Sequence, residues 1–198
     1  MVALTSAATP ASLIHEYLIE EDEMGDSTAQ SRLLDYLTAV LRWLYHSAGW
    51  FVARDLTFYH PAIRNSQQLI SPDIAVFKGI ALTEDQLWDL TSWDMRPAKK
   101  GAPRREPRPC PPVVIEVSSQ STWRTDIGDG PAYKPLVYGL IGVREYFAYD
   151  PNRQPVWRNQ QGQRLLGWRY DEQGQPIALA PDARMAVEPG TAELAGSR

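Results

Sequence analysis

The sequence predicts a single α/β or α+β domain in which helices flank a mixed β-sheet. Apolar residues recur at helical spacing from Ser27 to Tyr45, and short segments rich in branched and aromatic residues follow, separated by turn residues. A chain of 198 residues with 43% hydrophobic and 22% charged residues can bury a core without disulfide bonds. This composition argues against disorder, collagen-like repeats and coiled coils.

The first expected helix begins after Asp26 or Ser27, since either residue suits an N-cap, and it stops at Gly49. Its apolar positions recur at steps of three and four residues: Leu33, Leu34, Leu37, Val40, Leu41, Leu44 and Tyr45. Short strands are then expected at 50–52, 56–59 and 70–77, and Pro72 interrupts the start of the last one. The chain therefore passes from one amphipathic helix directly into a sheet.

The middle of the chain is predicted to be an insertion or long loop over 78–112, with one helical turn at 83–90, because Pro, Gly and basic residues crowd its second half. The run Val113-Val114-Ile115-Glu116-Val117 reads as a buried strand. A helix over 131–140 with Gly142 as terminator, and a strand over 144–150, come next. Segments at 156–157, 165–170 and 177–179 predict a closing C-terminal β-meander.

The domain is expected to span 26–185, between a loose acidic N-terminal segment at 1–25 and a flexible tail at 186–198. The formal net charge of the whole chain is −4, but residues 96–170 carry a net charge of +7. No apolar stretch approaches the ~20 residues that a membrane span needs, and the first residues lack the pattern of a secretion signal. We therefore expect a soluble, cytoplasmic protein, in which the lone Cys110 forms no disulfide.

Two acidic residues sit at predicted strand sites. Asp73 follows Pro72 at a strand entry, and Glu116 interrupts an otherwise apolar strand, where an ionised carboxylate is costly unless cations or donors compensate it. Two interpretations are open. Both carboxylates and a backbone carbonyl bind a hard divalent cation, or Glu116 pairs with an arginine such as Arg124 while Asp73 caps a turn. Serine hydrolase, P-loop and dinucleotide motifs are absent from the sequence.

A longer set of residues resembles a known family. It comprises Ser71-Pro72-Asp73-Ile74-Ala75-Val76, the segment Val114 to Thr122 (Val-Ile-Glu-Val-Ser-Ser-Gln-Ser-Thr), Asp126, Lys134, Tyr138, and the segment Gly142 to Pro151. Over about 26–180 the chain resembles the Uma-type ("Uma-two") family of restriction-endonuclease-like proteins. Those proteins look like members of the PD-(D/E)XK nuclease superfamily. The resemblance implies a restriction-endonuclease-like mixed sheet flanked by helices.

The resemblance also implies roles for individual residues. Asp73 and Glu116 match the two metal-binding acids, with the carbonyl of Val117 as a third ligand for Mg²⁺ or Mn²⁺. The superfamily lysine two positions after the glutamate is Ser118 here, and Lys134 matches the lysine that these proteins carry on the next helix. A solvated helical lysine is the alternative interpretation of Lys134. The acid that the superfamily often carries on its first helix has Gln30 and Asp35 as neighbouring candidates.

The function that follows is a Mg-dependent endodeoxyribonuclease, a hydrolase acting on phosphodiester bonds with DNA as its partner. We expect the basic residues Lys99, Lys100, Arg104, Arg105 and Arg124 to contact nucleic acid. A homodimer would suit cutting of both strands. The alternative is a catalytically degenerate protein of the same fold that binds nucleic acid or a protein partner without cutting, which Ser118 and the negative net charge favour. Ser121, Thr122 and Asp126 suit a helix cap better than a ligand site, and Tyr138 and Tyr146 suit packing.

Overall fold

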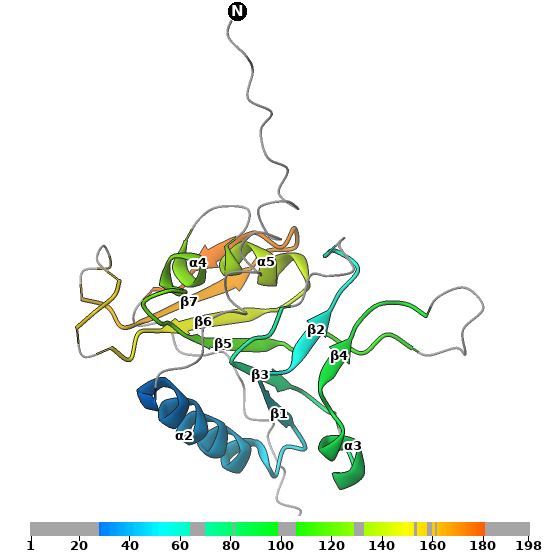
Figure 1. Ribbon diagram of the computed structural model, residues 1–198. Helices are drawn as coiled ribbons and strands as arrows, with labels where there is room; N and C mark the ends of the chain where they lie inside the picture. Colours follow the sequence, from blue (N-terminus) through cyan, green and yellow to red (C-terminus); the bar gives the residue numbers. More distant parts are fainter. Residues whose placement is uncertain are drawn as a thin grey trace, which may run out of the picture.

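The protein is built around a six-stranded mixed sheet. In the computed structural model, which describes residues 28–63, 70–80, 82–98, 106–128, 133–152, 154–157, 160 and 162–180, the strand order is β1-β3-β5-β6-β7-β8 (Figure 1). Strands β5 and β6 are parallel, and the other neighbours are antiparallel. The strands are β1 (Phe51–Arg54), β3 (Ile74–Phe77), β5 (Val113–Val117), β6 (Glu145–Tyr149), β7 (Leu165–Tyr170) and β8 (Pro176–Ala178).

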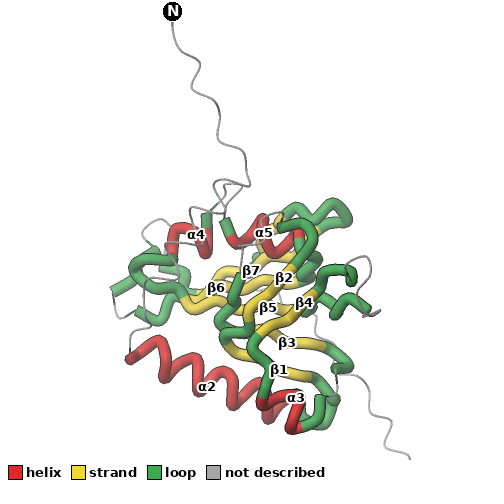
Figure 2. Tube along the Cα trace, turned by 45° about the vertical axis from the view of Figure 1, so that its right-hand side comes forward, coloured by secondary structure: helices red, strands yellow, loops and turns green. Residues whose placement is uncertain are grey.

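Helices cover both faces of this sheet, as predicted. Helix α2 (Thr28–Tyr45) lies on one side, and α4 (Trp123–Ile127) and α5 (Lys134–Leu140) lie on the other (Figure 2). Helix α3 (Glu84–Trp88) and a parallel pair of short strands, β2 (Thr57–Tyr59) and β4 (Ser92–Asp94), complete the described elements. None of the described helices has the length and apolar character to cross a membrane.

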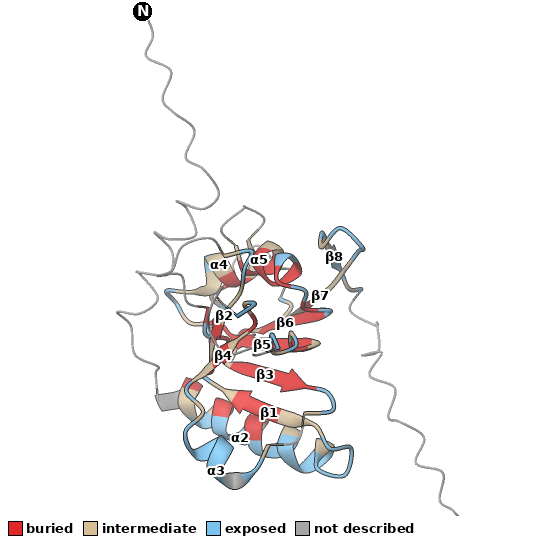
Figure 3. Cartoon of the chain, turned by 90° about the vertical axis from the view of Figure 1, so that its right-hand side faces the viewer, coloured by how far each residue is buried: buried red, intermediate tan, exposed pale blue. Residues whose placement is uncertain are grey.

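The alternation of side chains along β5 decides where its acid points. Val113 and Val117 belong to the apolar cluster that packs under α2, whereas Val114 belongs to the cluster on the opposite face, with Tyr138 of α5. Successive side chains of a strand point to opposite faces, so Glu116 shares the face of Val114. Strands β3, β5 and β6 are the most buried part of the molecule (Figure 3). Glu116 therefore points into the interior, toward α4 and α5.

Three local expectations differ from the structure. The third strand is shorter than 70–77 and starts at Ile74. Residues Val156 and Trp157 form no strand, because their backbone N–H groups donate to the buried carboxylate of Asp150 instead of to a neighbouring strand. The described part of 78–112 contains strand β4 as well as α3, and its Trp93 is 1% exposed in the core.

The remaining expectations about the chain ends lie outside the described residues. These are the loose segment 1–25, the candidate N-caps Asp26 and Ser27, and the tail 186–198. The long helix does run from Thr28 to Tyr45, the helical turn expected at 83–90 is α3, and the helix expected at 131–140 is described from Lys134 to Leu140. Periodicity and turn residues thus located α2, α3 and α5 within a few positions, whereas α4 was not predicted.

Candidate metal and phosphodiester site

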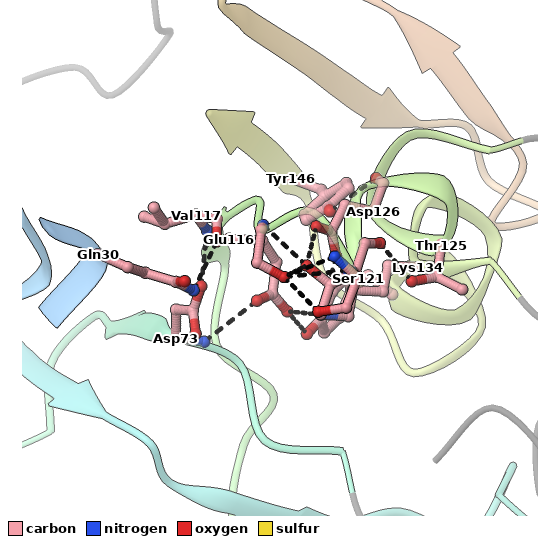
Figure 4. A network of polar contacts seen from close by, with 12 residues as sticks. Gln30, Asp73, Glu116, Val117, Ser121, Thr125, Asp126, Lys134 and Tyr146 are labelled. Atoms are coloured by element: carbon pink, nitrogen blue, oxygen red, sulfur yellow. Dashed lines mark hydrogen bonds and ion pairs between the residues drawn. The ribbon is translucent and has the colours of Figure 1, made fainter. Parts of the chain in front are cut away.

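Asp73 and Glu116 lie side by side because of the register between two strands. Strands β3 and β5 are antiparallel with Ile74 opposite Ile115, so continuing this register by one residue puts Asp73 opposite Glu116. Each carboxylate accepts a hydrogen bond from the backbone at or next to the other acid. The backbone N–H of Asp73 lies 3.4 Å from Oε2 of Glu116, and the N–H of Val117 donates to Oδ2 of Asp73 at 2.6 Å. Hydrogen bonds through the backbone thus link the two acids at the start of β3 and the end of β5 (Figure 4).

The first helix also reaches this point. Gln30, which is 7% exposed on α2, donates from Nε2 to the backbone oxygen of Val117 at 2.9 Å. Of the two candidates on this helix, Gln30 therefore belongs to the site. Asp35 faces outward and pairs with Arg54. The resemblance implied an acid near this position, and the structure has the amide of Gln30 there.

Lys134 enters from the opposite side as the first residue of α5. Its side chain is buried, 5% exposed, and its Nζ lies 3.2 Å from Oε1 of Glu116 and 3.0 Å from Oδ1 of Asp126. The interpretation of a solvated helical lysine is wrong for this residue. The alternative partner of Glu116 is also wrong, because Arg124 is exposed and lies over the ring of Trp123, at 4.8 Å from its centroid.

Tyr138 joins the same carboxylate. It follows Lys134 by four residues, so both side chains lie on one face of α5, and its hydroxyl donates to Oε1 of Glu116. Burial, and secondly the charge of Glu116, hold the pKa of Tyr138 well above its usual value. The phenol therefore stays protonated and remains a donor to the carboxylate, besides packing against Tyr146.

Asp126 is the third acid of the cluster. It is 1% exposed in α4, and its Oδ2 accepts a hydrogen bond from Thr122 Oγ1 at 2.9 Å. Thr122 precedes α4 but makes no side-chain cap hydrogen bond to that helix, so the expected capping role is not what its hydroxyl does. Neither burial nor the bond to Lys134 follows from the sequence around Asp126; its matching position in the family motif was the only signal.

Most of the expected basic contacts fall outside the part of the chain that the structure describes. Lys99, Lys100, Arg104 and Arg105 lie outside the described residues, and Arg124 is exposed on α4. Ser118, at the position where the resemblance implied a lysine, is buried within the described structure, and its hydroxyl has no hydrogen-bond partner there.

The donor set suits a hard divalent cation. Two carboxylates and a backbone carbonyl offer only oxygen, which Mg²⁺ and Mn²⁺ prefer. The formal charge of these side chains is −2, from the three carboxylates of Asp73, Glu116 and Asp126 and the one ammonium of Lys134. Among the described residues, no group of three or more His, Cys, Asp and Glu side chains is placed to hold an ion, so an ion bound here would need ligands other than these side chains.

Comparison with known proteins adds the family. A crystal structure of a putative nuclease belonging to DUF820 from Anabaena variabilis ATCC 29413 aligns with a TM-score of 0.44 and 15% identity, covering 81% of this chain and 72% of that one. No curated protein matches the sequence. The model of the Uma2 family, described as "Putative restriction endonuclease", matches residues 8–193. Since this match covers nearly the whole sequence, the chain belongs to the Uma2 family of nuclease-like proteins.

Proposed function

We propose that this protein is a metal-dependent endonuclease that hydrolyses phosphodiester bonds in DNA. The observation that carries the proposal is the meeting of Asp73 and Glu116 across β3 and β5, with a buried lysine on the second acid. Burying Glu116 and Asp126, with Asp73 half-buried beside Glu116, is costly for a protein that gains nothing from these acids, because each ion loses hydration. A divalent cation that neutralises the excess charge gives this arrangement a purpose.

Asp73, Glu116 and the carbonyl of Val117 are the proposed ligands of Mg²⁺ or Mn²⁺. A cation in this position supplies Lewis-acid polarisation of a phosphodiester oxygen and a lowered pKa for an attacking water. Gln30 fixes the carbonyl of Val117 and the N–H of Val117 fixes Asp73, so both donors are oriented before any ion binds.

Lys134 is the proposed cation for the reacting phosphate. Its ammonium is held at Glu116, where it can oppose the negative charge that develops on the phosphoryl oxygens during attack. Tyr138 remains a neutral donor to the same carboxylate and keeps Glu116 oriented. Together these groups supply what the lysine absent at Ser118 supplies elsewhere in the superfamily: a fixed positive charge next to the metal-binding glutamate.

The direct test is nicking of supercoiled plasmid DNA with Mg²⁺, Mn²⁺ or EDTA. Wild type should nick only with a divalent cation, and Asp73→Asn and Glu116→Gln should lose about a hundredfold or more of the rate. Glu145→Gln is the matched control: Glu145 is a buried acid at the other end of the parallel pair β5–β6, bonded to Arg169, and its loss should leave nicking unchanged. Melting curves verify that each variant folds.

Ion binding gives an independent measurement. A ligand at a hundred times its dissociation constant adds about 2.7 kcal/mol of stability, so saturating Mn²⁺ should raise the melting temperature of wild type and not of Asp73→Asn. If wild type and Asp73→Asn both fail to nick DNA but still retard it on a gel, the nuclease proposal is contradicted. The alternative, a protein that binds DNA without cutting it, is then supported. Because Asp73, Glu116 and Lys134 meet at one place in the described part of the chain, we also propose that cutting of both strands uses two copies.

A further inference from the structure

The ammonium of Lys134 is shared between two carboxylates from different elements. Glu116 comes from β5 and Asp126 from α4, and they lie 3.2 Å and 3.0 Å from Nζ. All three side chains are at most 6% exposed. Of the two acids, only Glu116 also contacts the backbone of Asp73 at the proposed ion site. The two acids therefore have different surroundings although they share one cation (Figure 4).

Asp126 is itself fixed from two sides. Its Oδ2 accepts from the hydroxyl of Thr122 at 2.9 Å, and its backbone oxygen accepts from the hydroxyl of Tyr146, on β6, at 2.8 Å. The end of α4 packs closely against the residue before Lys134: a Cβ on Gly128 would lie 2.7 Å from the ring of Tyr133. These contacts hold α4 and the start of α5 in one arrangement.

We infer that Asp126 is a positioning residue that retains Lys134 in the site when Glu116 binds the metal ion. This inference rests on the proposed function. A divalent cation and the ammonium both draw on the charge of Glu116, so they compete for it. A second buried anion gives Lys134 a partner that the metal does not use. Without Asp126, the ammonium would stay on Glu116 and oppose the ion.

The test is a double-mutant cycle read as Mn²⁺ affinity by titration calorimetry, which needs no activity. Asp126→Asn should weaken Mn²⁺ binding about tenfold when Lys134 is present, because Lys134 then pairs only with Glu116. In the Lys134→Met background the same substitution should change affinity by about twofold or less. Glu145→Gln removes one buried negative charge away from the cluster and should leave the affinity unchanged in both backgrounds.

A second variant covers the case in which Asp126→Asn does not fold. Thr122→Val removes the O–H donor to Asp126 but keeps its charge, and should weaken Mn²⁺ binding in the same direction and only when Lys134 is present. Equal losses with and without Lys134 would overturn the positioning role and leave the nuclease intact. The expected cycle in a protein that never nicks DNA would overturn the nuclease and leave the positioning role standing.

Discussion

At the scale of single residues, the positive charge of Lys134 matters both for the stability of the folded state and for the proposed chemistry. Removing it leaves Glu116 and Asp126 buried without their shared cation, and breaking a buried ion pair in this way typically costs about 3–5 kcal/mol. Lys134→Met should therefore lower the free energy of unfolding in EDTA by that order. Saturating Mn²⁺ should raise its melting temperature more than that of wild type, since the ion replaces the lost charge.

The control for this prediction is Lys78→Met. Lys78 is exposed, and its ammonium lies 5.6 Å from the ring centroid of Trp50. Unlike Lys134, it forms no ion pair with a buried acid among the described residues. Surface changes of this kind usually alter stability by no more than about 0.5 kcal/mol. Urea unfolding with and without Mn²⁺ measures both variants, and equal stability of the two would contradict the buried charge network.

Cys110 carries a second prediction at this scale. Burial raises the pKa of its thiol from 9.0 to about 12, so little thiolate forms at pH 8 and alkylation by iodoacetamide should be at least about tenfold slower than in the urea-unfolded chain. Because the pKa of the thiol is higher in the folded than in the unfolded chain, the thiol contributes its full stabilisation of the folded state below pH 9. This contribution is lost as the pH rises toward 12. The stability difference between wild type and Cys110→Ala should shrink over that interval. Equal labelling rates for folded and unfolded chains would contradict it.

At the scale of elements, α5 is held by a close approach of backbones. A Cβ on Gly139 would meet the carbonyl oxygen of Gly174 at 2.1 Å and the ring of Tyr170 at 2.5 Å, so the turn between β7 and β8 rests directly on this helix. Gly139→Ala should destabilise the fold by about 1–3 kcal/mol, since overpacking against backbone is poorly relieved. Leu140→Ala is the control, because Leu140 is half exposed at the next position. Urea midpoints compare the two, and a smaller loss for Gly139→Ala would argue against the close contact.

Local sequence patterns predicted the elements whose determinants are local. Helix α2 follows from its apolar spacing, and β5 follows from its branched run between prolines and polar residues. Strand β4 was missed because it has three residues and forms only through pairing with β2, more than thirty positions earlier in the chain. A pattern of single residues carries no information about such a partner.

The candidate site divides in the same way. Asp73 and Glu116 stood out because an acid in or beside a buried strand is unusual, and the register of two strands then brought them together. Asp126 and Tyr138 looked like a cap and a packing residue, since their bonds to Lys134 and to Glu116 join different elements and depend on how these pack. Whether Lys134 was solvated or buried likewise depended on tertiary packing.

At the scale of the whole molecule, charge is distributed unevenly along a chain that is acidic overall. The formal net charge is −4, although residues 96–170 carry +7 and residues 171–198 carry −3. Each phosphate contact made by a basic side chain releases counterions and makes binding weaker as salt rises. If residues 96–170 follow the DNA backbone, the salt dependence of binding should arise from basic residues in this part of the chain and not from basic residues elsewhere.

Matched pairs of substitutions test this distribution. Lys99→Ala with Lys100→Ala should weaken binding of a fluorescent duplex in EDTA and reduce the slope of log affinity against log salt by about 1.8 between 50 and 200 mM, which corresponds to about 0.9 per phosphate contact. Arg184→Ala with Arg198→Ala removes the same charge from the acidic C-terminal part and should leave the slope unchanged. Fluorescence anisotropy gives both slopes. Equal reductions in the two pairs would mean that net charge alone attracts DNA, because removing any two cations would then have the same effect.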